Sequence, residues 1–302
     1  PQNDISEVRG IVGATPLAAT MEDIKGRALM KRDEVDVVQF ALPVAGDNDI
    51  QIINNLRDQV QSLKDMWTGR TPAGIPMVPD ELTEAAFYGR EDVATLLDEG
   101  KVPLGLDLET VEPVTWELKK GNLLYLTDKE EQMIQFVKQI AHSKQKVIVL
   151  APAYNELPEM EGVTILSTKE DYVAGIKKME ENIQLRLEQQ KSQHEATIVL
   201  YNQLELMNDL SMDLQSSLNY VLEKGARAGY ATVAMSGSQL NRKIDEVSKS
   251  IKLYKQAIVA MRITDQSVLN VINRPVREEP LDSQVNYYVE DGFVRKVKVL
   301  MK

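Results

Sequence analysis

The stretch Leu123-Leu124-Tyr125-Leu126-Thr127-Asp128-Lys129-Glu130-Glu131-Gln132 joins a short apolar run to a polar, acidic segment. The same change from apolar run to polar segment recurs along the chain. The other apolar runs are Val147–Leu150, Val163–Leu166, Thr197–Leu200, Thr232–Met235 and Ile258–Ile263, and helical patterns lie at about 129–142, 170–191, 212–228 and 266–272. Strands read as continuous apolar runs when helices cover both faces of a parallel sheet. We therefore predict an α/β domain with a doubly wound, mainly parallel sheet flanked by helices.

The C-terminal end of the chain carries a different signal. Asn286–Glu290 and Phe293–Leu300 are separated by Asp291-Gly292. Asp-Gly between two strand-like runs is typical of a tight antiparallel turn. We expect a hairpin at this end of the sheet.

The N-terminal third does not share the strand–helix alternation. Short strands are predicted near 11–12, 27–30 and 35–42. Residues 48–68 predict an amphipathic helix that Asn48 caps and Gly69 ends. The stripe of that helix, which we expect to pack against the rest of the chain, comprises Ile53, Leu56, Val60, Leu63 and Trp67.

Domain boundaries follow from proline. Residues 70–80 contain three prolines, which favour an extended linker, and a short helix is predicted at 89–98. We divide the chain into residues 1–47, a helix and proline-rich linker over 48–101, and the α/β domain over 102–302.

Composition narrows the class of protein. The net charge is −11 and there are no cysteines, which excludes disulfides, Cys-based zinc sites and thiol nucleophiles. An acidic chain has no general attraction to phosphate backbones, so nucleic acid is not the expected partner. No apolar run approaches the ~20 residues of a membrane helix, and the N-terminus has no signal peptide, so we expect a cytosolic fragment.

A faint internal repeat links the two ends of the chain at a spacing of about 260 residues. Each copy is predicted as a short helix, a proline-bearing loop and a closing strand. The paired positions are Val8 with Val268, Ile11 with Val271, Val12 with Ile272, Gly26 with Asn286, and Leu29 with Val289.

Several segments together resemble a known family. They are Val102–Asp107, Glu112–Val114, Leu123–Leu126, Gly225–Val233, Ile24–Leu29, Gln39–Pro43 and Ile75–Pro79. Their order and spacing are similar to those of FtsK/SpoIIIE-type ATPases, and in particular to the EssC family of coupling ATPases in type VIIb secretion. The resemblance implies a RecA-like P-loop ATPase scaffold as the last domain, with residues 1–47 as the C-terminal tail of a preceding domain of the same kind.

The resemblance also implies the setting of the domain. The parent would be an ATPase anchored in the membrane of a Gram-positive bacterium, with ATP and Mg²⁺ as its cofactors. Implied partners are secreted substrates of the helical-hairpin type, the preceding ATPase domains of the same chain, and further copies in a homo-oligomer such as a hexamer.

The phosphate-binding turn expected of a P-loop is absent from the sequence. A working P-loop has glycines, Lys and Ser/Thr between its first strand and helix. The corresponding turn begins Thr127-Asp128-Lys129-Glu130 and contains no glycine. Its Thr-x-x-Glu spacing predicts a capping box, in which Thr127 accepts from the helix and Glu130 reaches back. Asp128 and Glu130 would repel a triphosphate, and Lys129 is the one cation in this turn.

The second nucleotide motif is missing as well. After the strand at 196–200 the family has carboxylates that hold Mg²⁺, whereas this chain has Tyr201-Asn202. Glu205 lies further along and would need a shift of the backbone to replace them. We interpret Thr127, Asp128, Lys129, Glu130, Tyr201 and Asn202 as the remnant of a nucleotide pocket.

Other chemical candidates are sparse. His142 and His194 lie in polar helical stretches without a partnered nucleophile. Arg227 and Arg274 are candidates for arginines that reach a neighbouring subunit, with surface salt bridges as the competing interpretation. No pattern of residues predicts a catalytic group or a metal site.

The sequence therefore predicts a non-catalytic ATPase-like domain of a type VII secretion motor, with no cofactor of its own. Its role would be substrate recognition, or assembly and regulation of the motor. The alternative is a weak or conditionally active ATPase whose site a neighbour completes. A fragment of a DNA translocase is a third hypothesis, which the net charge disfavours.

Overall fold

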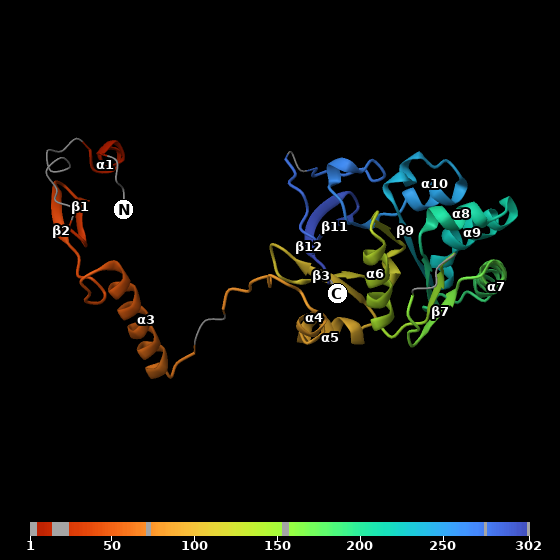
Figure 1. Cartoon of the computed structure of the whole chain (residues 1–302), viewed down its shortest axis with the longest axis horizontal. Coiled ribbons are helices and arrows are strands. Elements are labelled where there is room, and N and C mark those ends of the chain that lie inside the picture. Colours follow the sequence, from red (N-terminus) through yellow and green to blue (C-terminus); the bar gives the residue numbers. More distant parts are fainter. Residues whose placement is uncertain (1–4, 14–23, 71–73, 153–156, 275–276, 301–302) are drawn as a thin grey trace. The chain divides into compact units, whose positions relative to one another are not determined.

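The chain forms two compact units, Pro1–Gly74 (unit 1) and Ile75–Lys302 (unit 2). The structure is a computed structural model that describes residues 5–13, 24–70, 74–152, 157–274 and 277–300. Figure 1 shows the elements of each unit.

Unit 1 holds two helices and one hairpin among its described residues. Helix α1 spans Ile5–Val12 and helix α3 spans Asp49–Met66, while strands β1 (Arg27–Lys31) and β2 (Val35–Gln39) pair antiparallel. The side chain of Asn48 caps α3 by accepting from the N–H of Gln51, which confirms the predicted start. The predicted strand at 11–12 is wrong, because these residues end α1. Two adjacent apolar residues carry no period that separates strand from helix.

Unit 2 is built on one sheet with ten strands among its described residues, in the order β4-β3-β12-β11-β10-β5-β9-β8-β6-β7. The strands are β3 (Val102–Asp107), β4 (Pro113–Trp116), β5 (Leu123–Leu126), β6 (Val147–Leu150), β7 (Val163–Leu166), β8 (Ala196–Leu200), β9 (Tyr230–Ser236), β10 (Gln256–Val259), β11 (Val285–Glu290) and β12 (Phe293–Lys298). The six from β10 to β7 are parallel. The predicted mainly parallel sheet is confirmed, and the predicted hairpin is β11 and β12.

Helices cover both faces of this sheet. They are α4 (Glu84–Tyr88), α5 (Glu91–Asp98), α6 (Glu130–His142), α7 (Lys169–Glu188), α8 (Gln203–Asp209), α9 (Met212–Lys224) and α10 (Glu246–Lys252). Helix α6 covers one face, and α7 to α10 form a group on the other (Figure 1). Strand β5 shows the division, because Leu123 and Tyr125 belong to the α6 side and Leu124 and Leu126 to the opposite side. Successive side chains of a strand point to opposite faces.

The short helices α4 and α5 pack at the end of the sheet that holds β3. Their Phe87 and Val93 are buried with Leu82, Leu106 and Leu300 in a third apolar cluster. Helix α4 was not predicted, because five residues are too few to show a helical period.

The helix predicted at 266–272 does not form. Gln266 explains this difference, because its side chain accepts from the N–H of Leu269 at 2.8 Å and donates to the C=O of Leu269 at 3.2 Å. A polar side chain that bonds nearby backbone groups competes with the helix for them. The segment instead follows a short 3₁₀ turn at Ile263–Asp265.

The turn between α9 and β9 depends on Gly229. Its φ is +86°, and a Cβ at this position would lie 1.9 Å from the carbonyl oxygen of Gln193. The C=O of Gly229 accepts from the N–H of Glu195, which aligns the start of β8 beside β9. Only glycine meets both the backbone angle and the close approach.

We therefore expect Gly229→Ala to lower the free energy of unfolding by at least about 2 kcal/mol, since the left-handed backbone alone costs an alanine roughly 1–2 kcal/mol. Urea denaturation followed by circular dichroism measures the change. Gly74→Ala is the control, because nothing lies within 4 Å of a Cβ at Gly74. Equal stability of the two variants would contradict this account of the turn.

Candidate functional site

The connections of the sheet define where a ligand would bind. From β5 the chain crosses through α6 to β6 on one side, and from β9 it crosses back through α10 to β10 on the other. The two helices lie on opposite faces. In such sheets ligands bind in the crevice beyond the carboxyl ends of the strands where the direction reverses. This switch-point crevice lies between the residues that follow β5 and those that follow β9.

Asp128 spans the crevice. Its Oδ1 accepts a hydrogen bond of 2.8 Å from the backbone N–H of Ser238, in the loop after β9. A Cβ on Gly237 would lie 2.6 Å from the same oxygen, so glycine permits this approach. The carboxylate thus ties the turn after β5 to the loop after β9.

Thr127 has a different role from the predicted one. Its hydroxyl accepts from the N–H of Lys129 at 3.1 Å and donates to Oε1 of Gln132 at 2.6 Å. Lys129 is itself the N-cap of α6, which has no side-chain cap, so the predicted cap by Thr127 does not form. The predicted hydrogen bond from the backbone N–H of Thr127 to the side chain of Glu130 is wrong. That N–H donates instead to the C=O of Ser236 at 3.0 Å. Sheet pairing between β5 and β9 therefore overrides the capping box.

The turn after β8 presents no carboxylate at its first two positions. Tyr201 is buried, and its N–H donates to the C=O of Leu150 at 3.0 Å. Asn202 has φ +47° and begins α8, and its amide donates to Oε2 of Glu205 at 2.9 Å. Asn tolerates the left-handed region better than most residues. Glu205 is thus held against Asn202.

A buried polar network lies behind the crevice, and sequence reasoning did not find it. Ser236 donates to Oε1 of Gln203 at 3.2 Å, and Nε2 of Gln203 donates to the hydroxyl of Ser248 at 3.1 Å. All three side chains are fully buried. The network joins β9, α8 and α10. In the sequence, the one sign of this network is the polar Ser236 at the end of an apolar strand.

A second carboxylate occupies backbone amides after β10. Glu278 accepts from the N–H of Ile263 at 2.7 Å and from that of Thr264 at 2.9 Å. Burial raises the pKa of Glu278, but hydrogen bonds from these amides and from Tyr287 outweigh it and hold the pKa below its ordinary value of 4.5. Carboxylates of the chain itself therefore fill two amide sites at the carboxyl edge of the sheet.

The two candidate arginines lie at opposite edges of the sheet. Arg227 is exposed on the 3₁₀ turn Gly225–Ala228, at the amino end of β9. Arg274 lies beyond the carboxyl end of β10 and donates to the C=O of Thr264 at 3.2 Å. The structure does not bring them together.

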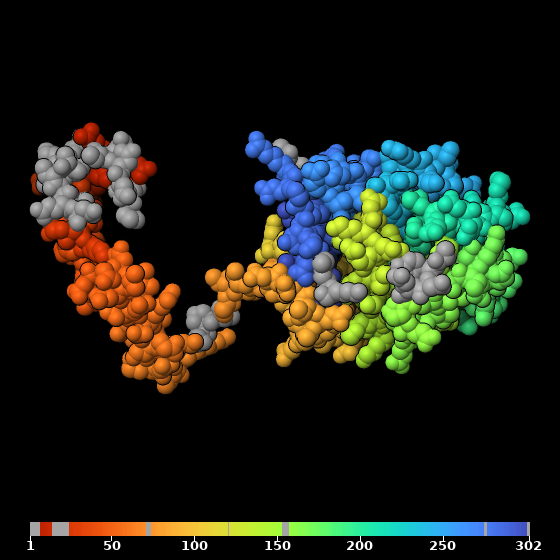
Figure 2. Space-filling view, viewed as in Figure 1, coloured from red at the N-terminus to blue at the C-terminus, as the bar shows by residue number. Residues whose placement is uncertain are grey.

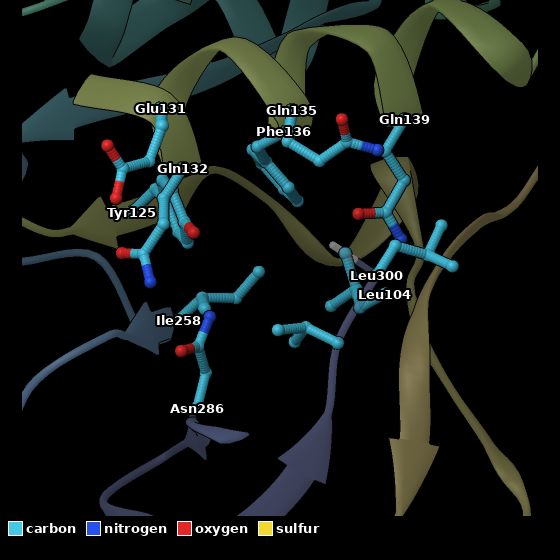
Figure 3. Close-up of a pocket in the computed structure, with 11 residues that line it drawn as sticks. Leu104, Tyr125, Glu131, Gln132, Gln135, Phe136, Gln139, Ile258, Asn286 and Leu300 are labelled. Carbon is cyan, nitrogen blue, oxygen red and sulfur yellow. The ribbon is translucent and has the colours of Figure 1, made fainter. Parts of the chain in front are cut away.

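An apolar pocket of about 240 Å³ lies between α6 and the strands of the same face. Figure 3 shows the side chains of α6 facing those of β3, β5 and β10 across it. Its lining comprises Leu104, Tyr125, Glu131, Gln132, Gln135, Phe136, Gln139, Ile258, Asn286, Val299 and Leu300. The rings of Tyr125 and Phe136 stack at 4.7 Å. Gln132 belongs to both sites, because it lines the pocket and bonds Thr127.

The described residues offer no other chemical centre. No group of three His, Asp or Glu side chains among them is arranged to hold a metal ion. None of the described helices is long and apolar enough to cross a membrane.

Similarity to known proteins extends over nearly the whole chain. The type VII secretion system protein EssC of Staphylococcus aureus (strain MRSA252) is 24% identical over 98% of this chain. The ESX secretion system protein YukB of Bacillus subtilis is 27% identical over 92% of it. The chain spans 20% of the length of each relative. No model of a protein family matches the chain.

Solved structures agree with this similarity. ATPases 2 and 3 of EssC from Geobacillus thermodenitrificans give a TM-score of 0.78 at 22% identity, covering 99% of this chain and 59% of that one. ATPases 2 and 3 of EccC from Thermomonospora curvata, solved with a signal sequence peptide, give 0.57 at 16% identity, covering 94% and 55%. The resemblance to the EssC family is confirmed, and the fold is that of a RecA-like P-loop ATPase.

Glu278→Gln tests the second amide site. A neutral amide cannot accept from both N–H groups as a carboxylate does, so we expect the free energy of unfolding at pH 7 to fall by about 1 kcal/mol. Because the folded pKa of Glu278 lies below 4.5, the advantage of the wild type is present above this pH. It is lost as the pH falls through the folded pKa.

Urea denaturation at pH values from 7 to 3 measures both effects. Glu279→Gln is the matched control on an exposed neighbour. A stability difference between wild type and Glu278→Gln that stays constant over this range would contradict the assignment.

Proposed function

We propose that unit 2 is a non-catalytic ATPase-like domain of a type VII secretion motor that binds secreted substrates through the apolar pocket beside α6. The observation that carries the proposal is an accessible apolar pocket beside a switch-point crevice whose turn after β5 is acidic. That turn has no glycine and carries Asp128, Glu130 and Glu131.

Electrostatics argue against ATP in the crevice. A triphosphate would have to displace the Asp128 carboxylate from the N–H of Ser238. It would also lie near the exposed side chain of Glu130, with Lys129 as the one cation in the turn. Two like unit charges 4 Å apart repel by about 1 kcal/mol in water and about 4 kcal/mol near a protein surface. Retaining a nucleotide would need several new favourable contacts to offset this repulsion.

The pocket suits apolar side chains of a partner helix. Its volume of about 240 Å³ lies below the ~300–1,000 Å³ of sites that enclose a whole small molecule. Amphipathic helices bind such surfaces by inserting anchors spaced three or four residues apart. On its α6 side, Gln132 accepts from Thr127 through Oε1, and Gln135 donates to Oε1 of Glu84 at 3.1 Å through Nε2. The amide nitrogen of Gln132 and the amide oxygen of Gln135 are suited to hydrogen bonds with a bound segment.

The solved relatives give this role a precedent. The EccC structure of T. curvata was determined in complex with a signal sequence peptide, so a protein of this fold binds such a peptide. The same class of ligand is proposed for the present chain, together with roles in assembly and regulation of the motor.

We assign residues 1–47 to the C-terminal tail of a preceding ATPase-like domain, 48–101 to the connecting helix and proline-rich linker, and 102–302 to the degenerate ATPase-like domain. The hairpin β1–β2 supports this division. When 260 is added to the residue numbers of β1–β2, both strands fall within two residues of β11–β12. In unit 2 the hairpin β11–β12 extends the sheet from β10. The parent protein would be anchored in the bacterial membrane and would act as a homo-oligomer.

Calorimetric titration with ATP–Mg²⁺ tests the first half of the proposal. We expect no binding heat at micromolar to low-millimolar nucleotide, because the turn after β5 has no glycine and its acidic side chains repel a triphosphate. A P-loop ATPase with complete motifs serves as the positive control. Micromolar binding accompanied by hydrolysis would refute the proposal in favour of an active site that a neighbouring subunit completes.

Gln135→Trp tests the pocket. Gln135 is half-buried and lines it, so the larger ring should fill the space and weaken binding of a fluorescent helical-hairpin substrate by at least about 10-fold. Fluorescence anisotropy measures the affinity. Lys138→Trp is the control, because Lys138 lies on the same helix and does not line this pocket. Unchanged binding in Gln135→Trp, or no binding by the wild type in any oligomeric form, would count against the assignment.

A further inference from the structure

The apolar pocket beside α6 contains a hydrogen-bond acceptor that the chain leaves without a donor. Gln139 lines the pocket and is 5% exposed. Its Nε2 donates to the C=O of Pro103 at 2.6 Å. Among the described residues, none donates to its Oε1. Figure 2 shows α6, in yellow-green, beside the blue C-terminal strands on this face of unit 2.

The direction of the Gln139 amide is set by its partner. A backbone C=O only accepts hydrogen bonds, so the amide must turn its nitrogen toward Pro103 and its oxygen away from it. A flipped amide would place two oxygens against each other. Figure 3 shows the oxygen of Gln139 directed into the pocket, toward the space between Phe136 and Leu300. The pocket therefore presents an acceptor of defined position to whatever enters it.

The other amides of the lining are placed differently. Gln132 and Gln135 are half-buried, so water reaches them and competes for their hydrogen bonds. Asn286 is 2% exposed, and it hydrogen-bonds the hydroxyl of Tyr125. Gln139 combines deep burial with an oxygen that no described group satisfies.

A buried acceptor without a donor makes a pocket selective. Leaving such a group unpaired costs free energy, because it has lost water and gained no replacement. A ligand that supplies a donor removes this cost, whereas a ligand of the same shape without a donor leaves it in place. A site with a buried polar group therefore rejects the analogue that cannot pair with that group.

The size and lining of the pocket limit which side chain can supply the donor. Glu131 is the one charged side chain of the lining, and it is exposed. A Lys or Arg side chain buried beside Gln139 would therefore lose its hydration without a counter-charge. Ser and Thr are too small for a volume of about 240 Å³, since an apolar cavity of about 150 Å³ already holds a benzene ring. An aromatic side chain with an N–H or O–H group meets both conditions.

We propose that Gln139 makes this pocket selective for an aromatic anchor that carries a neutral N–H or O–H donor. The donor bonds Oε1 of Gln139, and the ring occupies the apolar space lined by Phe136 and Leu300. Gln139 is thus a specificity-determining residue. The inference rests on the proposed function for the source of the anchor, a helical segment of a secreted substrate. The preference for a donor follows from the pocket alone.

Indole and benzothiophene test this preference without any protein partner. The two rings have nearly the same shape, and benzothiophene carries sulfur where indole has its N–H donor. Chemical-shift titration of the isotope-labelled full chain measures both affinities. We expect indole to bind at least about 3-fold more tightly, because only indole pairs with Oε1 of Gln139. Equal binding, tighter binding of benzothiophene, or no shifts at the lining residues up to the solubility limit would each overturn the proposal.

The variant Gln139→Met assigns the preference to its residue. Methionine has a similar length and no oxygen, so we expect the preference to reverse in favour of benzothiophene, the more apolar ring. Gln145→Met is the matched control, because Nε2 of Gln145 also donates to a backbone C=O, that of Gly100 at 2.7 Å, and Gln145 does not line the pocket. Indole should keep its advantage in this control. An unchanged advantage in a folded Gln139→Met chain would overturn the proposal, and if this variant does not fold, the wild-type comparison still decides.

A helical hairpin links the preference to the proposed function. Two designed hairpins differ at a single exposed anchor, which is tyrosine in one and phenylalanine in the other, and fluorescence anisotropy measures their affinities. We expect the tyrosine hairpin to bind the wild type at least about 3-fold more tightly, and to lose this advantage in Gln139→Met. If both hairpins bind the wild type equally, the donor preference is refuted while the proposed function stands. If neither hairpin binds but indole keeps its advantage over benzothiophene, the proposed function fails and the selectivity of the pocket stands.

Discussion

The structure depends on the burial of β5 on both of its faces. Leu123 and Tyr125 contact the α6 side of the sheet, and Leu124 and Leu126 contact the side covered by α7 to α10. Both edges of β5 pair with parallel neighbours, β10 and β9, so the chain reaches its next parallel strand by crossing over a face. The crossing through α6 runs opposite to the crossing through α10, and this reversal creates the crevice beside β5. The candidate site thus follows from the strand order around this buried strand.

Carboxylates of the chain hold backbone amides at the carboxyl edge of the sheet. Asp128 bonds the N–H of Ser238, and Glu278 bonds those of Ile263 and Thr264. Each contact is a charge-assisted hydrogen bond, which is stronger than a neutral one. The buried polar network of Gln203, Ser236 and Ser248 joins α8, β9 and α10 behind these contacts.

The apolar pocket on the α6 face is joined to the turn after β5 by one side chain. Gln132 lines the pocket and accepts from the hydroxyl of Thr127. Occupation of the pocket and the conformation of this turn therefore share one side chain.

The sequence by itself determined the parallel sheet, the C-terminal hairpin, the start of α3 and the absence of P-loop glycines. These are local properties, because an apolar run, an Asp-Gly turn or an Asn cap reads from neighbours within about four residues. The tertiary structure decided the partners of Asp128, Gln203 and Glu278, the place of the pocket, and the failure of the capping box at Glu130. Asp128 and Ser238 are 110 residues apart, and only the pairing of β5 with β9 brings them together. The hydrophobic period and the capping residues of a segment indicate the local structure of that segment alone. A site assembled from several strand ends depends on the strand order, which no local pattern contains.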